Sequence, residues 1–469
     1  MADKTDALVM FGATGDLAKR ALFPALDQLQ RQGKLGIPII GVARSEWDDE
    51  ELRNYARKSI EEFGPDGLDE EAFAELARCF SYVQGEYDGD DTYERLRTKL
   101  GGAEHPLAYL AVPPSVFEHV IKGLAHAGLT TNGRVIVEKP FGRDLESARI
   151  LNECLLRYFK EDDVLRMDHF LGKDSVLDLL VFRFDNLLLE PLWNRHYIER
   201  VEITLAEDFG VEGRGAFYEE VGALRDVVQN HLLELVMLVA MEPPAASDQR
   251  ALRDEKVKLL RAMRSFDPKC MVRGQHEGYR EEKGVAPDSD VETYVAVEAY
   301  IDNWRWSGVP FYIRAGKRME ATVTEVVVQF HSPPDPLFRD PSLPPPSPNR
   351  FLFRLKPDEG ISLTVQVKEP GEGLISTPVD LDYSYDENRE KLQETAYERL
   401  IGDGIEGDAA LFARSDAIEE AWRIVMPALE SPPLLHTYAQ GSWGPKEADD
   451  LVPGGWHNRI PPFARNEAL

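Results

Sequence analysis

One segment of the 469-residue chain, RMDHFLGKD at residues 166–174, gathers acid–base groups densely enough to support catalysis or ligand binding. It places Asp168, His169 and Lys173 within six residues. His169 and Lys173 could bind an anion, and Asp168 could orient another catalytic group. An exposed polar loop with no ligand is the competing interpretation of this segment when it is considered alone.

A second candidate is a strongly apolar segment, LRDVVQNHLLELVMLVAM at residues 224–241, which also contains Asp226 and His231. Burying these groups without partners would be costly. A partnered histidine suits general-base chemistry near neutral pH, and a hydrogen-bonded core histidine is the alternative. On an α-helix, residues five apart lie about 140° round the axis. We therefore expect His231 to take its carboxylate partner from elsewhere in the chain.

The third candidate is VIVEKPFGRD, residues 135–144, in which an apolar strand runs into Glu138, Lys139 and Pro140. A lysine at the carboxyl end of a parallel strand lies where ligands bind in this class of sheet. A cis peptide before Pro140 would fix the direction of the lysine side chain. The alternative is a surface Lys-Pro turn.

A glycine-containing turn near the amino terminus, FGATGDLAKR, follows an apolar run at residues 7–11. Glycines can adopt backbone shapes closed to other residues, and a helix starting near Asp16 would offer free N–H groups to a phosphate. Thr14 stands where the usual G-x-G-x-x-G motif has its middle glycine, so this motif alone is weak evidence. We predict that a dinucleotide binds at Gly12, Thr14, Gly15, Asp16 and Leu17.

The end of the next apolar run, GVARS, bears on which dinucleotide binds. NAD enzymes usually carry Asp or Glu at this place for the ribose hydroxyls. Arg44 and Ser45 instead suit the additional phosphate of NADP, whereas Glu46 argues for NAD. We predict NADP as the cofactor and leave NAD open, and Arg44 could also be a surface arginine without a ligand.

Two sequence patterns along the chain suggest the elements that position these groups. The first third alternates short apolar runs with helical patterns, which predicts a parallel sheet with helices on both faces. The runs are 7–11, 37–42, 80–83, 107–112 and 134–137, and the helical patterns include 17–30 and 47–63. Past about residue 175, longer runs predict antiparallel strands at 201–206, 293–301, 310–314, 323–330, 350–355 and 361–367. With the helix at 224–241, they indicate an α+β domain.

The predicted fold class is therefore α/β plus α+β. We predict a dinucleotide-binding domain at 1–173 and an α+β domain at 174–469. The proline-rich stretch 333–348 is expected to form an exposed loop.

Composition limits the kinds of partner. The chain carries a net charge of −29, which disfavours binding to nucleic acid and requires that any phosphate site concentrate its cations locally. Cys79, Cys154 and Cys270 lie far apart, which argues against disulfides or a zinc site and fits a reducing compartment. We see no signal peptide or membrane-spanning run, so we expect a cytoplasmic protein that binds no membrane.

Eight blocks, in order from about residue 10 to about residue 450, together resemble the glucose-6-phosphate dehydrogenase family. They are GATGDLAKR, YLAVPPSVFEHV, VEKPFGRD, RMDHFLGKD, EGRGAFYEEVGALRDVVQNHLLELVMLVAMEPP, FYIRAGKRM, AYERLI and YAQGSWGPKEADDL. The ordered set is far more specific than any one block.

The resemblance implies the reaction and its catalytic groups. His231 would take the proton of the anomeric hydroxyl of glucose 6-phosphate while hydride passes to NADP, and Asp168 would orient His231. Lys139 would contact both substrate and cofactor. The products would be 6-phosphogluconolactone and NADPH, as in the first step of the oxidative pentose phosphate pathway.

The resemblance also implies the remaining substrate contacts and the assembly. The 6-phosphate would be held by His169 and Lys173, and the sugar by Glu207, Asp226 and Lys317. The resemblance further implies that the dinucleotide-binding domain is Rossmann-like and that residues 174–469 form a substrate-binding and oligomerisation domain with a broad antiparallel sheet. The family works without a metal and forms homodimers or homotetramers through that sheet.

Two positions depart from the family pattern, both at the phosphate end of the substrate. Phe170 replaces a tyrosine whose hydroxyl helps to bind phosphate, and Thr322 stands where a lysine or arginine is usual. Arg318 is a candidate to compensate. The departures leave open a related hexose dehydrogenase with altered recognition at carbon six or with NAD preference. A catalytically silent relative is disfavoured, because Asp168 and His231 are both present.

Overall fold

The computed structural model describes residues 4–335, 337–338, 346–385 and 394–458. Contacts group the chain into two units, the first containing 1–173, 244–254 and 394–419 and the second 174–243, 255–393 and 420–469. The proline-rich stretch 333–348 lies partly outside the described residues, and its described residues form no helix or strand.

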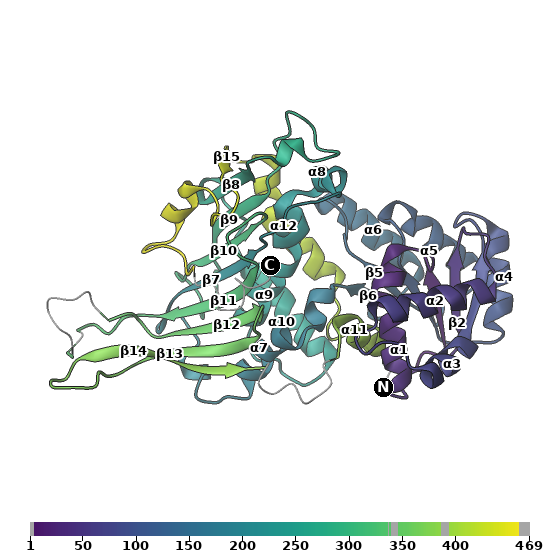
Figure 1. Cartoon of the computed structure of the whole chain (residues 1–469), viewed down its shortest axis with the longest axis horizontal. Helices are drawn as coiled ribbons and strands as arrows, with labels where there is room; N and C mark the ends of the chain where they lie inside the picture. The colour runs from purple at the N-terminus through teal and green to yellow at the C-terminus, as the bar shows by residue number, and fades with distance from the viewer. Residues whose placement is uncertain (1–3, 336, 339–345, 386–393, 459–469) are drawn as a thin grey trace. The chain divides into compact units, whose positions relative to one another are not determined.

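The first unit is built on a six-stranded sheet in the order β3-β2-β1-β4-β5-β6 (Figure 1). All its neighbouring strands are parallel, which confirms the predicted Rossmann-like fold. The strands are β1 (Ala7–Phe11), β2 (Ile39–Ala43), β3 (Phe80–Gln84), β4 (Pro106–Leu110), β5 (Arg134–Glu138) and β6 (Val164–Met167). The strand order reverses at β1, so the carboxyl ends of β1 and β4 flank the crevice where ligands bind in such sheets.

Helices cover both faces of this sheet because successive strand side chains point to opposite sides. Leu8 and Met10 of β1 pack in one core, whereas Val9 and Phe11 pack in the other. The first core receives α1 (Phe23–Arg31), α2 (Asp49–Phe63), α3 (Glu70–Cys79) and α11 (Ala396–Glu406). The second receives α4 (Asp90–Leu100), α5 (Phe117–His126) and α6 (Leu145–Tyr158). A helix from late in the sequence, α11, is thus part of the first core.

The second unit contains a nine-stranded sheet in the order β14-β13-β12-β11-β7-β10-β9-β8-β15 (Figure 1). Its strands are β7 (Ile198–Ala206), β8 (Met271–His276), β9 (Tyr294–Ala299), β10 (Phe311–Gly316), β11 (Val323–Phe330), β12 (Arg350–Lys356), β13 (Gly360–Lys368), β14 (Ser376–Ser384) and β15 (Leu435–Tyr438). Most pairs are antiparallel, as predicted. The exceptions are β10 beside β7 and β15 beside β8, which run parallel. The expected antiparallel strand at 310–314 is thus antiparallel to β9 but parallel to β7, because helices and the strands β8 and β9 lie between β7 and β10 in the chain.

Helices of the second unit include α7 (Asp174–Phe184), α8 (Gly215–Ala223) and the predicted helix at 224–241. The latter begins as a π-helix, η6 (Leu224–Leu232), and continues as α9 (Leu233–Ala240). A π-helix bonds each N–H to the carbonyl five residues earlier. The assumed separation of about 140° between Asp226 and His231 is therefore wrong, since it supposed α-helical geometry.

The remaining long helices are α10 (Gln249–Ala262) and α12 (Ser415–Glu430). Among the described residues, no helix combines the length and apolarity that crossing a membrane requires. The three cysteines are free thiols, as their spacing predicted.

Candidate active site

The turn after β1 has the backbone shape that a dinucleotide site needs. Gly12 has a φ of +80° and donates its N–H to the Val42 carbonyl at 2.9 Å. A Cβ there would lie 2.1 Å from the Ala111 carbonyl oxygen, so only glycine fits. Gly15 has no positive φ, and its N–H donates to the Gly12 carbonyl at 2.9 Å. The helical segment that leads through η1 (Ala18–Leu22) into α1 begins at Asp16, as predicted. The first N–H groups of this segment suit a phosphate.

The end of β2 lies beside this turn. The Ser45 hydroxyl donates to Oγ1 of Thr14 at 3.1 Å, and the Tyr55 hydroxyl donates to the Thr14 carbonyl at 3.2 Å. Arg44 is exposed at the end of β2 and close enough to Tyr87 to oppose the rise in the Tyr87 pKa that burial causes. Hydroxyls and an exposed guanidinium round one turn fit the additional phosphate of NADP.

The end of β6 carries the predicted catalytic acid and phosphate ligands. Asp168 is 3% exposed, and its carboxylate accepts the Phe170 N–H at 3.0 Å, which caps the short 3₁₀ helix η4 (His169–Gly172). The His169 ring stacks on Tyr397 of α11, with centroids 5.8 Å apart and planes 9° apart. Lys173 places its Nζ 5.0 Å from the centroid of the Phe170 ring. This segment is therefore a fixed turn rather than a loose polar loop.

Helix α11 holds that turn in place. The Arg399 guanidinium donates to the Gly172 carbonyl at 3.0 Å. A Cβ on Gly172 would lie 2.6 Å from the Ala396 carbonyl oxygen, so turn and helix are in close backbone contact. The AYERLI block of the sequence is the start of this helix.

Lys139 follows directly on β5, and the Lys139–Pro140 peptide is cis, as the sequence suggested. Glu138, the last residue of β5, pairs in register with Met167 of β6. Its carboxylate accepts the Tyr109 hydroxyl at 2.5 Å, and burial raises the Glu138 pKa to about 7. Sequence reasoning gave Glu138 and Tyr109 no role, although Tyr109 opens one of the family-like blocks.

The predicted sugar ligands of the second unit gather round Tyr218, a buried residue of α8. Lys317, just after β10, forms an ion pair with Glu207, just after β7, at 2.5 Å. The Lys317 Nζ also lies 5.5 Å from the Tyr218 ring. Burial raises the Tyr218 pKa, and the nearby Asp226 and Glu207 carboxylates contribute to the same shift. Sequence reasoning missed Tyr218, which lies in the longest family-like block.

The two departures from the family pattern have their own partners. The Thr322 hydroxyl accepts the Asp208 N–H at 3.1 Å. Arg318, the candidate to compensate, forms an ion pair with Glu212 at 2.6 Å. The guanidinium is thus engaged by a carboxylate in this structure, and its contribution to phosphate binding stays a prediction.

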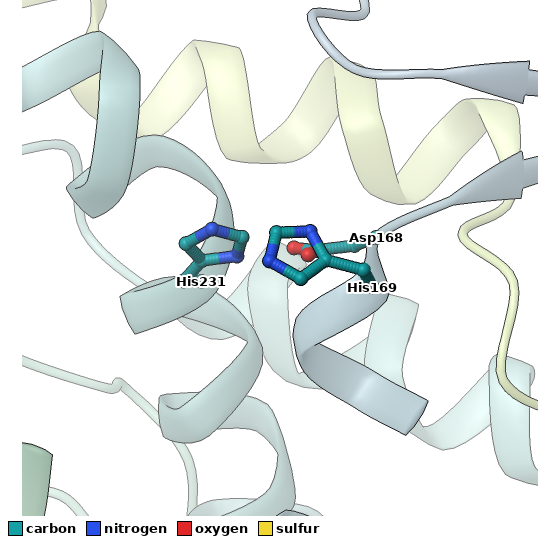
Figure 2. A group of neighbouring side chains, drawn as sticks. All are labelled: Asp168, His169 and His231. Atoms are coloured by element: carbon teal, nitrogen blue, oxygen red, sulfur yellow. The ribbon is translucent and has the colours of Figure 1, made fainter. Parts of the chain in front are cut away.

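His231 lies near the end of η6 and is 7% exposed. Its backbone N–H donates to Oδ1 of Asn230 at 2.7 Å. Figure 2 draws His231 on η6, and Asp168 and His169 where β6 passes into η4. An imidazole carried on an apolar helix and a buried carboxylate at a strand end are the group types that acid–base catalysis requires.

Comparisons with known proteins show which family the chain belongs to. A sequence model of the glucose-6-phosphate dehydrogenase NAD binding domain matches residues 9–178, and one of the C-terminal domain matches residues 180–457. The chain is 45% identical over 456 residues to glucose-6-phosphate 1-dehydrogenase 1 of Mycobacterium bovis, covering 97% of this chain and 96% of the relative.

Two solved structures extend the similarity to the whole fold. A glucose-6-phosphate 1-dehydrogenase from Mycobacterium avium is 46% identical with a TM-score of 0.90, covering 98% of this chain and 100% of that one. A glucose-6-phosphate dehydrogenase in complex with its substrate glucose-6-phosphate is 36% identical with a TM-score of 0.91, over the same shares of each chain. The chain belongs to the glucose-6-phosphate dehydrogenase family.

Proposed function

We propose that this chain oxidises the anomeric carbon of glucose 6-phosphate with NADP, giving 6-phosphogluconolactone and NADPH. The observation that carries the proposal is the family match across both halves of the chain, residues 9–178 and 180–457. Within that match, His231 and Asp168 retain the base and the carboxylate that the reaction needs.

Each chain residue has one task in the proposed mechanism. His231 removes the proton of the anomeric hydroxyl, because hydride loss would otherwise leave positive charge on the sugar. Asp168 orients the imidazole and stabilises its charged form. When bound, NADP supplies the hydride acceptor. Lys139 follows β5, which pairs with β6, the strand that precedes Asp168, and it contacts both substrate and cofactor.

The substrate is held at both ends. His169 and Lys173 bind the 6-phosphate, while the ion-paired Lys317 and Glu207, with Asp226, bind the sugar hydroxyls. Binding energy from the phosphate, remote from the reacting carbon, helps to hold that carbon in position for hydride loss.

The dinucleotide binds over the β1 turn. The N–H groups of Asp16 and Leu17 at the helix start, together with the hydroxyl of Thr14, bind its diphosphate, and Gly12 and Gly15 shape the turn so that the diphosphate can approach it. Arg44 binds the additional phosphate, which favours NADP over NAD.

We further propose that residues 1–173 bind the dinucleotide, and that 174–469 bind the sugar and mediate assembly into a homodimer or homotetramer. The resemblance to the glucose-6-phosphate dehydrogenase family supports this assembly role. The proposed location is the cytoplasm, which fits the three free thiols.

A substrate panel tests the function. Nicotinamide reduction is followed spectrophotometrically with glucose 6-phosphate, glucose and other hexose phosphates, each with NADP and with NAD. We expect the highest kcat/KM for glucose 6-phosphate with NADP. A preference for unphosphorylated glucose would instead support a hexose dehydrogenase with altered recognition at carbon six, which the family match does not favour.

Replacement of the base tests the mechanism. His231→Ala is expected to lower kcat by about 10²- to 10⁴-fold while the dissociation constant of glucose 6-phosphate stays nearly unchanged. His126→Ala, at an exposed position of α5, is the matched control and should leave both constants unaltered. Wild-type turnover by His231→Ala would refute the assignment of the base.

A further inference from the structure

Within the first unit, three neighbouring strand ends and one helix bring ionisable side chains together behind the predicted catalytic carboxylate. Tyr109 lies on β4, Glu138 ends β5, and Asp168 follows β6. In register, Glu138 pairs with Met167, the residue directly before Asp168. Tyr397 of α11 stacks on His169, the residue directly after Asp168. The mechanism above uses neither Glu138 nor Tyr109.

The Glu138 carboxylate is held firmly in this arrangement. The Tyr109 hydroxyl donates to its Oε1 at 2.5 Å and lies 3.2 Å from the Met167 sulfur. Glu138 is 8% exposed and Tyr109 is 1% exposed, so bulk water screens their charges little. A glutamate at this depth with a dedicated phenol partner has a fixed position and a strong electrostatic effect on its neighbours.

The ionisable groups that face Glu138 come from each element round it. They are Tyr109 from β4, Lys139 from its own strand end, Asp168 from the end of β6 and Tyr397 from α11. Burial raises the Glu138 pKa to about 7, with Asp168 adding to the rise and Tyr109 and Lys139 opposing it. Burial, with Glu138 and Asp168, also raises the Tyr397 pKa.

We propose that Glu138 is a positioning residue whose charge, controlled by Tyr109, sets the electrostatic potential at Asp168 and thereby the basicity of His231. The link to His231 rests on the proposed function. An ionised Glu138 adds a second negative charge behind Asp168, which stabilises the protonated imidazole formed as the substrate loses its proton. A neutral Glu138 does not stabilise the protonated imidazole in this way, so His231 becomes less basic.

Two nearly isosteric variants test this because one removes the Glu138 charge at every pH and the other removes it only where Glu138 holds its proton. Glu138→Gln removes the charge at every pH, so the acid limb of kcat should move down by about half to one pH unit and the plateau should fall about 3- to 10-fold. Tyr109→Phe removes the hydrogen bond that stabilises the ionised carboxylate. Glu138 then keeps its proton to higher pH, so the acid limb should also move down, whereas kcat should return toward the wild-type plateau at alkaline pH, where Glu138 ionises.

Two controls separate this role from structural damage. Glu138→Asp keeps a carboxylate and should restore much of the plateau that Glu138→Gln loses. Glu146→Gln changes an exposed carboxylate on α6 and should leave the profile unaltered. Circular dichroism and thermal unfolding of each variant confirm the fold, and loss of structure alone would not let the kcat of Tyr109→Phe return at alkaline pH.

The outcomes are distinguishable from failure of the proposed function. If the wild-type protein does not oxidise glucose 6-phosphate, the proposed function is wrong. If the wild type is active and the Glu138→Gln and Tyr109→Phe profiles coincide with it, if their acid limbs move up, or if Tyr109→Phe stays as low as Glu138→Gln at alkaline pH, the role of Glu138 is wrong. Downward shifts of both acid limbs, with recovery of Tyr109→Phe at alkaline pH and rescue by Glu138→Asp, support it.

Discussion

The contact between Lys173 and the Phe170 ring gives the family departure at position 170 a physical meaning. The ammonium lies 5.0 Å from the ring centroid, a cation–π geometry that helps to fix the lysine in the absence of a tyrosine hydroxyl. At a partly exposed site such a contact contributes about 0.5–1 kcal/mol. The aromatic ring at this position therefore supports Lys173, the proposed phosphate ligand, by fixing its side chain rather than by donating a hydrogen bond to the phosphate.

Substitution of Phe170 checks this view. Phe170→Leu keeps an apolar side chain but removes the π face, so the KM for glucose 6-phosphate should rise about 2- to 5-fold with kcat nearly unchanged. The control is a double-mutant cycle with Lys173→Met, measured by steady-state kinetics. If the two effects simply add, Phe170 does not act through Lys173.

At the residue scale, the sequence was informative wherever a group stood at a strand end or in a recognisable block. Lys139, Asp168 and His169 were singled out in this way. The partnership of Tyr109 with Glu138 was not predictable, because it depends on the register of two strands and on burial. The contact of Tyr397 was not predictable for a different reason. Its ring stacks on His169, which lies more than two hundred residues away in the sequence.

Among the elements, the turn after β1 is the one that most strictly requires a particular residue, the glycine at position 12. Gly12→Ala would place a Cβ 2.1 Å from the Ala111 carbonyl and force φ +80° on an L-residue, which costs at least about 1–2 kcal/mol. We expect a lower melting temperature, measured by thermal unfolding. We also expect a larger dissociation constant for NADP, measured by fluorescence titration. Gly36→Ala, where a Cβ meets nothing within 4 Å, is the control. Equal binding by both variants would contradict a cofactor site at this turn.

Strand β11 carries a buried carboxylate that should weaken the fold at alkaline pH. Burial raises the Glu325 pKa from 4.5 to about 7, against the opposing effect of Arg314 and Arg354. The folded state thus holds the proton more tightly than the unfolded state. The contribution of Glu325 to stability is greatest below pH 4.5 and is lost as the pH rises through about 7.

Glu325→Gln should remove this dependence. The variant is expected to gain up to about 3 kcal/mol in the free energy of unfolding near pH 8, and little near pH 5. Urea unfolding at both pH values measures the difference, with the exposed Glu320→Gln as the control. A gain of the same size at both pH values would show that ionisation of Glu325 is not the cause.

Strongly apolar elements were the predictable ones. The runs that became β1, β4, β7 and β11 stood out because they are buried along most of their length. β6 was missed because it has only four residues, and β14 because its exposed, polar-rich sequence contains a proline. The π-helical start of the helix at 224 was also missed, since periods near 3.6 and 4.4 residues cannot be separated over so few apolar positions.

For the whole molecule, β14 is the natural place to test assembly, because it is an edge strand of the nine-stranded sheet. Leu381 on this strand is 58% exposed, which is unusual for a large apolar residue. If the proposed oligomer forms through this sheet edge, Leu381→Lys should lower the mass in light scattering toward 53.0 kDa. Ile150→Lys, on α6 and 60% exposed, is the control. An unchanged mass for Leu381→Lys would exclude β14 from the interface.

The place of α11 in the first core has a consequence for biosynthesis. Leu400, Ile401 and Ile405 complete the packing over one face of the parallel sheet, yet they are translated long after the last strand of that sheet. While the ribosome is still adding the second unit, part of this face has no cover. A gene fragment ending after β6 should therefore yield an aggregation-prone polypeptide, and the first unit can finish folding only when most of the chain has been made.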